Sequence, residues 1–287
     1  MRKRLGILAL PAAMLALASP AFGQDLEQLA GAAGGETAFD GDWLSFGLGV
    51  GLNPSYEGSD DYNFIPVPLI QGEVAGIGIN PRPAGLAFDI VPDPDEGAGF
   101  SFGPSIRLRA SRAQSINDPV VESVGELDRA IEIGPSAGIA VPKVLHEYDS
   151  ISLSLDARWD IAGAHEGFVL APSITYFTPL SRGAAVSLTV DAEHGDDRFM
   201  EYYYSVTPED ALASGLSPFQ AQGGFTRAGA LLIAGLDFNG DLADGGLALF
   251  AIGSYSRMLG DAKASPFTSE RGSADQWLGA LGLGYTF

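Results

Sequence analysis

Apolar and polar side chains alternate along much of this chain. In the clearest stretch, every second residue from Ile151 to Ile161 is apolar, and the residues between them are serine, aspartate or arginine. The same alternation recurs in residues 44–52, 100–109 and 186–193. A period of two is typical of a β-strand with one apolar and one polar face.

The length of these segments distinguishes membrane-spanning strands from the strands of globular proteins. With their flanking residues these segments span about ten to thirteen residues, whereas strands of globular proteins usually have about five or six and a tilted bilayer-spanning strand needs roughly 9–11. After the first 23 residues, the longest apolar stretches, 228–236 and 245–253, have nine residues each, too few for a membrane-spanning helix. The pattern therefore predicts an all-β transmembrane antiparallel β-barrel, with an ordinary β-sandwich as the alternative.

We predict about twelve strands, within a range of ten to twelve. An even number is typical of bacterial single-chain barrels. The predicted strands begin near Trp43, Tyr62, Ile77, Phe100, Arg129, Asp149, Gly167, Gly183, Phe199, Phe225, Gly245 and Asp275. Residues 199–206 are open to another interpretation as part of a long loop, and the segment around Pro81 and Pro83 must be bulged or broken.

The connections between these strands conflict with the usual arrangement of short periplasmic turns and long outer loops. With both barrel termini on the periplasmic side, the long Met258–Ala274 connection lies outside, but so does the short Pro179–Arg182 turn. The long Ser111–Asp128 connection then lies on the periplasmic side. Either this loop has a periplasmic role or the strand list is wrong by one in two places.

The first residues have the features of a secretory signal peptide. Arg2, Lys3 and Arg4 precede an apolar run from 5 to 18, and small residues place the cleavage site between Gly23 and Gln24. The apolar run is shorter than the roughly 20 residues of a membrane-anchoring helix. We therefore predict a signal peptide over 1–23, a short periplasmic segment over 24–42 and the barrel domain over 43–287.

The final predicted strand carries aromatic residues near both of its ends. Trp277, Leu283, Tyr285 and Phe287 share one face, as expected of an outward strand that meets both membrane interfaces. This pattern looks like the terminal strand that the barrel-assembly machinery of Gram-negative outer membranes reads.

Composition excludes several other classes of protein. The 287 residues include 16 Lys plus Arg against 36 Asp plus Glu, so the formal net charge is −20. A chain this acidic repels phosphate backbones, so we expect no nucleic-acid partner. The absence of cysteine excludes a disulfide scaffold and thiolate chemistry.

Charged residues on the inward strand faces are the candidate functional residues. The predicted faces direct Arg107, Arg109, Arg158, Glu132, Asp156, Asp160, Asp191 and Glu193 into the lumen. A barrel of about twelve strands lies between side-chain-filled and water-filled sizes. We expect opposite charges to pair and partly plug the lumen, and the alternative is a selective pore with these arginines at its constriction.

Catalytic and metal-binding patterns are weak. Asp191, Glu193, His194, Asp196 and Asp197 resemble an acid–histidine arrangement that activates water, but we favour a solvated acidic rim, which needs no catalytic explanation. The other two histidines, His146 and His165, are interpreted as isolated surface residues in turns. We expect no catalytic residue, no cofactor and no metal.

Several ordered motifs resemble the MipA/OmpV family of outer-membrane proteins. They are Phe-Gly-Leu-Gly-Val-Gly at 46–51, Tyr-Glu-Gly-Ser-Asp-Asp-Tyr at 56–62, Ile-Pro-Val-Pro-Leu-Ile at 65–70, Phe-Gly-Pro at 102–104, Val-Thr-Pro at 206–208 and Tyr-Ser-Arg-Met-Leu-Gly-Asp at 255–261. The resemblance implies an outer-membrane barrel with a non-enzymatic scaffold role. For the founding member of the family, this role is described as binding a membrane-bound lytic transglycosylase and linking it to a bifunctional penicillin-binding protein, enzymes of murein hydrolysis and synthesis. The resemblance carries the fold over to this chain better than the partner.

We therefore expect an exported protein of the Gram-negative cell outer membrane, surrounded by lipid and lipopolysaccharide, that acts as a scaffold or binding protein at the cell envelope. The alternatives are a porin-like channel or an adhesin, which other members of the family look like. An outer-membrane hydrolase is a remote alternative.

Overall fold

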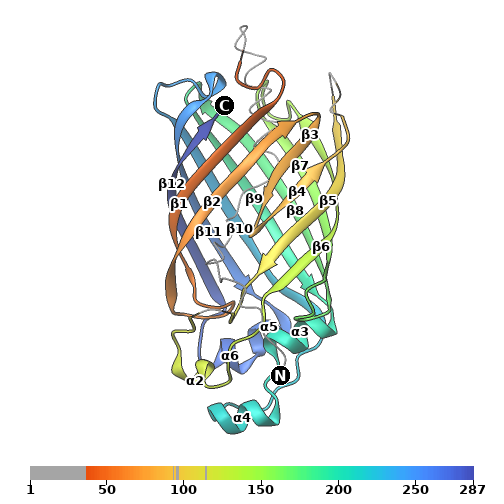
Figure 1. Cartoon of the computed structure of the whole chain (residues 1–287), viewed down its shortest axis with the longest axis vertical. Coiled ribbons are helices and arrows are strands. Elements are labelled where there is room, and N and C mark those ends of the chain that lie inside the picture. The colour runs from red at the N-terminus through yellow and green to blue at the C-terminus, as the bar shows by residue number, and fades with distance from the viewer. Residues whose placement is uncertain (1–36, 93, 95–96, 114) are drawn as a thin grey trace, which may run out of the picture.

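The computed structural model describes residues 37–92, 94, 97–113 and 115–287, and this part of the chain forms a closed antiparallel barrel of twelve strands (Figure 1). Each strand pairs with its neighbours in sequence, and the last strand closes the barrel on the first, from Ser45 opposite Thr286 to Leu52 opposite Gly279. The strands are β1 (Trp43–Pro54), β2 (Tyr62–Val74), β3 (Ile77–Arg82), β4 (Gly85–Asp89), β5 (Gly99–Arg109), β6 (Ala130–Pro142), β7 (Ser150–Asp160), β8 (Phe168–Ser181), β9 (Ala184–Gly195), β10 (Gly224–Asp237), β11 (Gly246–Met258) and β12 (Asp275–Thr286). The predicted fold class is confirmed. The predicted signal peptide, with cleavage between Gly23 and Gln24, lies outside the described residues.

The two ends of the barrel differ in their connections. One end, here called the turn end, holds the start of β1, the end of β12 and connections of two to nine residues, such as 75–76, 90–98 and 182–183. The other end, here called the helix end, holds the longer connections and their helices (Figure 1). These are α2 (Pro119–Glu122), α3 (Asp197–Tyr204), α4 (Pro208–Ser214), α5 (Gly260–Ala264) and α6 (Pro266–Ser269), while the short helix η1 (Leu242–Asp244) lies at the turn end. Short turns face the periplasm in bacterial barrels, so the helix end faces outward from the cell.

Two corrections to the predicted strands remove the conflict in the connections. The segment beginning near Ile77 is two short strands, β3 and β4, joined at Pro83 and Ala84, because the prolines interrupt the alternation that marks a long strand. The segment at Phe199 is a helix, α3, whose N-cap Asp196 accepts a hydrogen bond from the Phe199 N–H. The long Ser111–Asp128 connection therefore lies at the helix end and the short Pro179–Arg182 turn at the turn end, opposite to the prediction for both.

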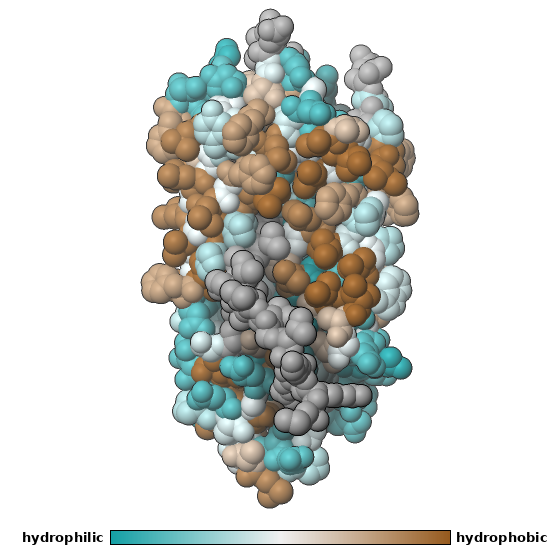
Figure 2. Space-filling view, viewed as in Figure 1, coloured by the Kyte–Doolittle hydropathy of each residue, from teal (hydrophilic) through white to brown (hydrophobic). Residues whose placement is uncertain are grey.

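On the face of the barrel shown in Figure 2, an apolar belt lies between two polar ends. Outward side chains such as Leu48, Phe64 and Leu281 are 63–77% exposed although they are apolar. Aromatic side chains border the belt at the helix end (Tyr62, Trp159, Phe225, Trp277) and at the turn end (Phe46, Phe238, Tyr285, Phe287). This arrangement fits a hydrocarbon layer bounded by two membrane interfaces. Among the described residues, no helix is long and apolar enough to span a membrane.

Candidate functional site

Side chains fill the turn-end half of the lumen with an apolar layer. Its members come from seven strands, from β8 through β12 to β1 and β2, and from the two segments beside them. They are Phe39, Trp43, Val67, Phe177, Ala185, Leu231, Ile233, Ala243, Phe250, Ile252 and Ala280. The remaining wall supplies small buried residues, among them Ala87, Ser105 and Ser152. Large lumen side chains thus come from one wall and small ones from the other, a combination that suits a narrow barrel.

The glycine repeat of β1 makes room for this layer. Gly47, Gly49 and Gly51 lie on the lumen face, and a Cβ atom on Gly47 would lie 2.9 Å from the Phe250 ring. A Cβ atom on Gly49 would lie 3.0 Å from the same ring. The Phe-Gly-Leu-Gly-Val-Gly motif therefore combines an outward apolar face with an inward face that admits an aromatic ring from β11.

An ion-pair network crosses the helix-end half of the lumen, and Arg109 is its centre. Its Nε lies 2.7 Å from Oε1 of Glu132, its second terminal nitrogen 2.9 Å from Oε2 of Glu193, and its first 2.6 Å from Oε1 of Glu57. Arg107 also pairs with Glu193. Because β5 and β9 are four strands apart, these bonds tie distant parts of the wall together.

A second cluster extends the network toward β3 and β7. Asp156 accepts from Arg82 Nε at 3.0 Å and from Arg158 at 2.7 Å. Arg158 Nε also lies 3.6 Å from Oε2 of Glu132, which joins the two clusters. The side chains of Glu132 and Glu193 are fully buried. Charges this deeply buried persist because each has partners of opposite sign.

The eight predicted lumen charges fall into three groups. Six of them, Arg107, Arg109, Glu132, Asp156, Arg158 and Glu193, belong to the network. Asp191 pairs instead with Arg227 at 2.8 Å. Asp160 lies on the same strand face but at the rim, where it accepts from the backbone N–H groups of Ala162 and Glu166 at 2.9 and 3.1 Å and so holds the β7–β8 connection.

Three network contacts were not predicted from the sequence. Glu57 reaches in from the β1–β2 connection, and Arg82 comes from the proline-rich segment treated as broken. His165 was expected at the surface, but its side chain is fully buried with Nε2 3.3 Å from Oε1 of Glu132, because the connection that carries it folds under α3. His146 is exposed, near the hydroxyl of Thr178 at 2.8 Å.

A helical lid covers the network at the helix end. The guanidinium of Arg109 lies 4.6 Å from the Phe199 ring centre, and the Tyr204 hydroxyl donates to Glu57 at 2.8 Å. Both aromatic residues belong to α3. Around them pack Val169, Met200, Tyr203, Ala221, Met258 and Ala262. A second apolar cluster from α2, α4, α6 and nearby loops, including Tyr56, Val121, Leu216 and Phe267, lies beside it.

Asp118 fastens the lid. It caps α2 by accepting from the N–H groups of Val120 and Val121, and it pairs with Arg271 at 2.6 Å. Burial alone would raise the pKa of this carboxyl, but the hydrogen bonds from Arg271 and from α2 outweigh burial and hold the pKa below 3.8. Nearby, burial lowers the pKa of Arg112 to about 10, and its guanidinium lies 4.1 Å from the centre of the Phe267 ring.

The proposed acid–histidine arrangement is dispersed in the structure. Glu193 points into the network, whereas His194 packs edge-on against Phe225 with 5.4 Å between ring centres. Asp196 caps α3, and Asp197 accepts from the Gly223 N–H at 2.7 Å. Among the residues described, no group of three or more His, Cys, Asp or Glu side chains is placed to hold a metal ion.

The aromatic face of the last strand points away from the lumen. Trp277, Leu283, Tyr285 and Phe287 are 59%, 48%, 47% and 68% exposed. The backbone N–H of Phe287 donates to the Leu44 carbonyl at 3.0 Å, which continues the β1–β12 pairing to the last residue. These four residues therefore lie on the lipid-facing surface at the seam where the barrel closes.

These features define an outer-membrane β-barrel protein: a closed barrel of twelve membrane-length and shorter strands, an apolar belt and two aromatic girdles. Over residues 46–287 the chain matches the family described as MltA-interacting protein MipA, so it belongs to the MipA family of the outer membrane. No curated protein matches it.

Solved structures with a similar fold include an outer membrane channel from Pseudomonas putida F1, at 12% identity and a TM-score of 0.44, which covers 86% of this chain and 96% of that one. The translocator domain of the autotransporter NalP from Neisseria meningitidis is 14% identical, with a TM-score of 0.34, and covers 91% and 94% of the two chains.

Proposed function

We propose that this outer-membrane barrel is a non-enzymatic binding protein that holds a murein hydrolase of the lytic-transglycosylase class at the cell envelope. The family description, MltA-interacting protein, supports this class of partner. The observation that carries the proposal is the filled lumen, in which an apolar layer and a buried ion-pair network occupy successive halves. A lumen filled by its own side chains favours function at the ends of the barrel over conduction through it.

The turn end is the surface we assign to this partner, since murein lies on the periplasmic side. One connection there is prearranged for contact. Asp149 is buried and accepts from the N–H groups of Val144 and Leu145 and from the Tyr176 hydroxyl. Leu145 is thereby held 75% exposed. An exposed apolar side chain on a fixed loop loses little conformational entropy when a partner covers it.

The test is binding of a purified lytic transglycosylase to the immobilised full chain. We expect Leu145→Asp to weaken binding by about tenfold or more, the effect of losing a buried apolar contact of about 1.4 kcal/mol or more. Leu212→Asp is the matched control, because Leu212 on α4 is 89% exposed at the helix end. Absence of binding to the unmodified chain contradicts the proposal, and equal loss in both variants contradicts the assigned surface.

A bifunctional penicillin-binding protein is the second partner we propose, so that hydrolase and synthase share one anchor. Adding it to the preformed pair should give a ternary complex, detected by size-exclusion chromatography with light scattering. Planar-bilayer recording decides the porin-like alternative, because stepwise conductance from the unmodified chain favours a pore. Binding of host-cell surfaces through the helix end favours an adhesin, and hydrolysis abolished by His194→Ala favours a hydrolase.

We also propose that the outward residues of β12 are read during assembly. Their exposure at the closing seam supports this role. Replacing Phe287 with alanine should lower the fraction of protein inserted by purified barrel-assembly machinery into liposomes. The matched replacement of Phe238, which is 62% exposed at the same end, should leave insertion nearly unchanged.

A further inference from the structure

The barrel wall is incomplete between β2 and the β3–β4 hairpin. β2 pairs with β1 along its length, from Glu73 to Tyr62, but with β3 only at residues 72–74 in the part of the chain described. The hairpin strands have six and five residues, whereas the other strands have 11–14. Residues 62–71 therefore form a free strand edge in the helix-end half of the wall.

Two prolines keep this edge from pairing. In an antiparallel ladder, alternate residues direct their N–H groups toward opposite neighbours. Pro66 and Pro68 stand in the unbroken β1–β2 register opposite Val50 and Leu48, so they belong to the set directed away from β1. Because proline has no N–H, the edge lacks donors that another strand would need. The Ile-Pro-Val-Pro motif thus maintains the gap.

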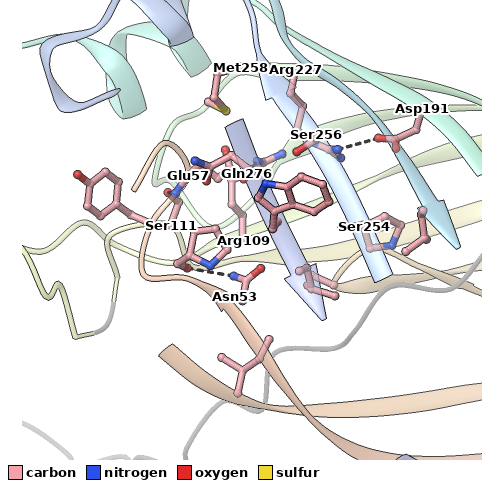
Figure 3. Close-up of a pocket in the computed structure, with 18 of the residues that line it drawn as sticks. Asn53, Glu57, Arg109, Ser111, Asp191, Arg227, Ser254, Ser256, Met258 and Gln276 are labelled. Atoms are coloured by element: carbon pink, nitrogen blue, oxygen red, sulfur yellow. Dashed lines mark hydrogen bonds and ion pairs between the residues drawn. The ribbon is translucent and has the colours of Figure 1, made fainter. Parts of the chain in front are cut away.

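A cavity of about 180 Å³ lies behind the gap (Figure 3). Its lining comes from both sides of the gap, with Ile65 on β2, Pro83 and Ala84 at the hairpin tip and Leu108 on β5. The far wall is formed by β10, β11 and β12, including Leu231, Ser254, Ser256 and Leu278. Residues on both sides of the gap therefore also line the cavity. Arg107 and Arg109 of the ion-pair network border the cavity as well.

The gap faces the membrane. Beside it, outward Phe64 is 77% exposed, and Leu52 and Trp277 on the neighbouring strands are 42% and 59% exposed. These residues lie toward the helix-end termini of β1, β2 and β12 and contribute to the outward apolar surface. A molecule that reaches the cavity through the gap therefore comes from the outer leaflet of the membrane.

The polar groups of the cavity indicate the charge of its occupant. Arg227 pairs with Asp191 at 2.8 Å, and their side chains are 18% and 19% exposed, more than those of the network arginines. Figure 3 shows this pair beside Ser254, Ser256 and Gln276. The lining arginines already face Asp191, Glu57 and Glu193. A charged ligand group would therefore find no unpaired residue of opposite charge in this cavity. A hydroxyl or amide group would find both hydrogen-bond donors and acceptors.

We propose that this cavity binds a neutral amphipathic molecule, with an alkyl or aromatic body and a hydroxyl or amide head, which enters sideways from the membrane through the gap below the β3–β4 hairpin. The apolar body lies against Ile65, Leu231 and Leu278, and the head meets the Arg227–Asp191 pair. The site is separate from the turn-end surface assigned to the protein partner.

The test is photolabelling of the full chain in phosphatidylethanolamine and phosphatidylglycerol nanodiscs with a long-chain alcohol that carries an alkyl diazirine. Mass spectrometry should find the label on lumen residues Ile65 and Leu278. Ser254→Trp fills the cavity from β11 and should lower this labelling severalfold. Leu247→Trp is the matched control, because Leu247 is on the same strand but faces lipid and is 46% exposed.

Labelling confined to outward residues such as Leu52 and Phe64, which do not line the cavity, overturns the proposal. Ser256→Phe is a second cavity-filling variant if Ser254→Trp does not fold, as judged by heat-modifiable gel mobility. Lumen labelling that persists in folded cavity-filled protein also overturns the proposal. Phospholipid that copurifies with the unmodified chain but not with the filled variant contradicts a neutral occupant and also overturns the proposal, because its phosphate is ionised. Displacement of the label by added dodecanol without phospholipid release supports a neutral amphiphile.

Discussion

The two halves of the lumen are filled by opposite kinds of chemistry. In the turn-end half, apolar side chains such as Phe177 and Ile252 pack in one buried cluster, in which contact needs only size and shape. In the helix-end half, Arg109 alone contacts three carboxylates from three different segments. Apolar contacts tolerate conservative exchange, whereas a buried charge that loses a partner remains buried. The apolar layer therefore supplies bulk, and the network fixes which segments face one another.

The largest expected effect is from Glu193→Ala. This change removes the fully buried carboxylate that Arg107 and Arg109 share, so the free energy of unfolding should fall by about 3–5 kcal/mol. Urea titration in detergent micelles, followed by tryptophan fluorescence, measures this loss. A double variant with Arg107→Ala should lose less than the sum of the two single variants, because the pair is coupled. A loss below about 1 kcal/mol contradicts the assigned role of the network.

The apolar layer should respond more gradually. Ile252→Ala removes a buried side chain and should lower the free energy of unfolding by about 2–5 kcal/mol, whereas Ile252→Val should cost about 0.5–1.5 kcal/mol. Leu247→Ala on the same strand is the control. Leu247 faces the lipid or detergent and not the lumen, so its replacement should cost less than Ile252→Ala. If Ile252→Val costs as much as Ile252→Ala, the layer is as specific as the network and the comparison fails.

Local patterns were sufficient to predict the barrel, because period and strand length are properties of short segments. They failed at β4, which is too short to show a pattern beside Pro81 and Pro83, and at α3, where dense aromatic residues concealed the N-cap signal of Asp196. The inward direction of Arg107 and Glu193 could be predicted, because alternate residues of a strand point to opposite faces. Their pairing did not, because it depends on how β5 and β9 face across the lumen. Glu57 and His165 enter from connections whose positions depend on the folded lid, so no local signal marks them.

A smaller and local effect is expected at the lid. Asp118→Ala removes the cap of α2 and the pair with Arg271, and should destabilise α2 by about 0.5–2 kcal/mol. Asp118→Asn keeps a capping side chain and should cost less. Hydrogen exchange at the Val120 and Val121 amides measures both, because these N–H groups bond to Asp118.

The lid should also loosen in acid. The pKa of Asp118 is lower in the folded chain than its ordinary 3.8, so its stabilising contribution is complete above 3.8 and disappears as the pH falls through the lower folded value. Exchange in α2 should therefore accelerate in this range relative to the intrinsic rate. Asp118→Asn should not show this acceleration, and an identical pH profile in both proteins contradicts the role of the carboxylate.

The smallest effect is expected at Arg182, which pairs with Asp241 at the turn end. The Arg182 side chain is 70% exposed, whereas the side chains of Arg109 and Glu193 are at most 2% exposed. Water and salt screen an exposed pair, so Arg182→Ala should change the free energy of unfolding by about 0–1 kcal/mol, and less at high salt. The urea titration used for Glu193→Ala measures it directly. Both variants remove one partner of an arginine–carboxylate pair, and the two pairs differ mainly in burial. The difference between their losses in unfolding free energy therefore reports the effect of burial. Equal losses would mean that the lumen network is hydrated and that the filled-lumen basis of the proposed function is wrong.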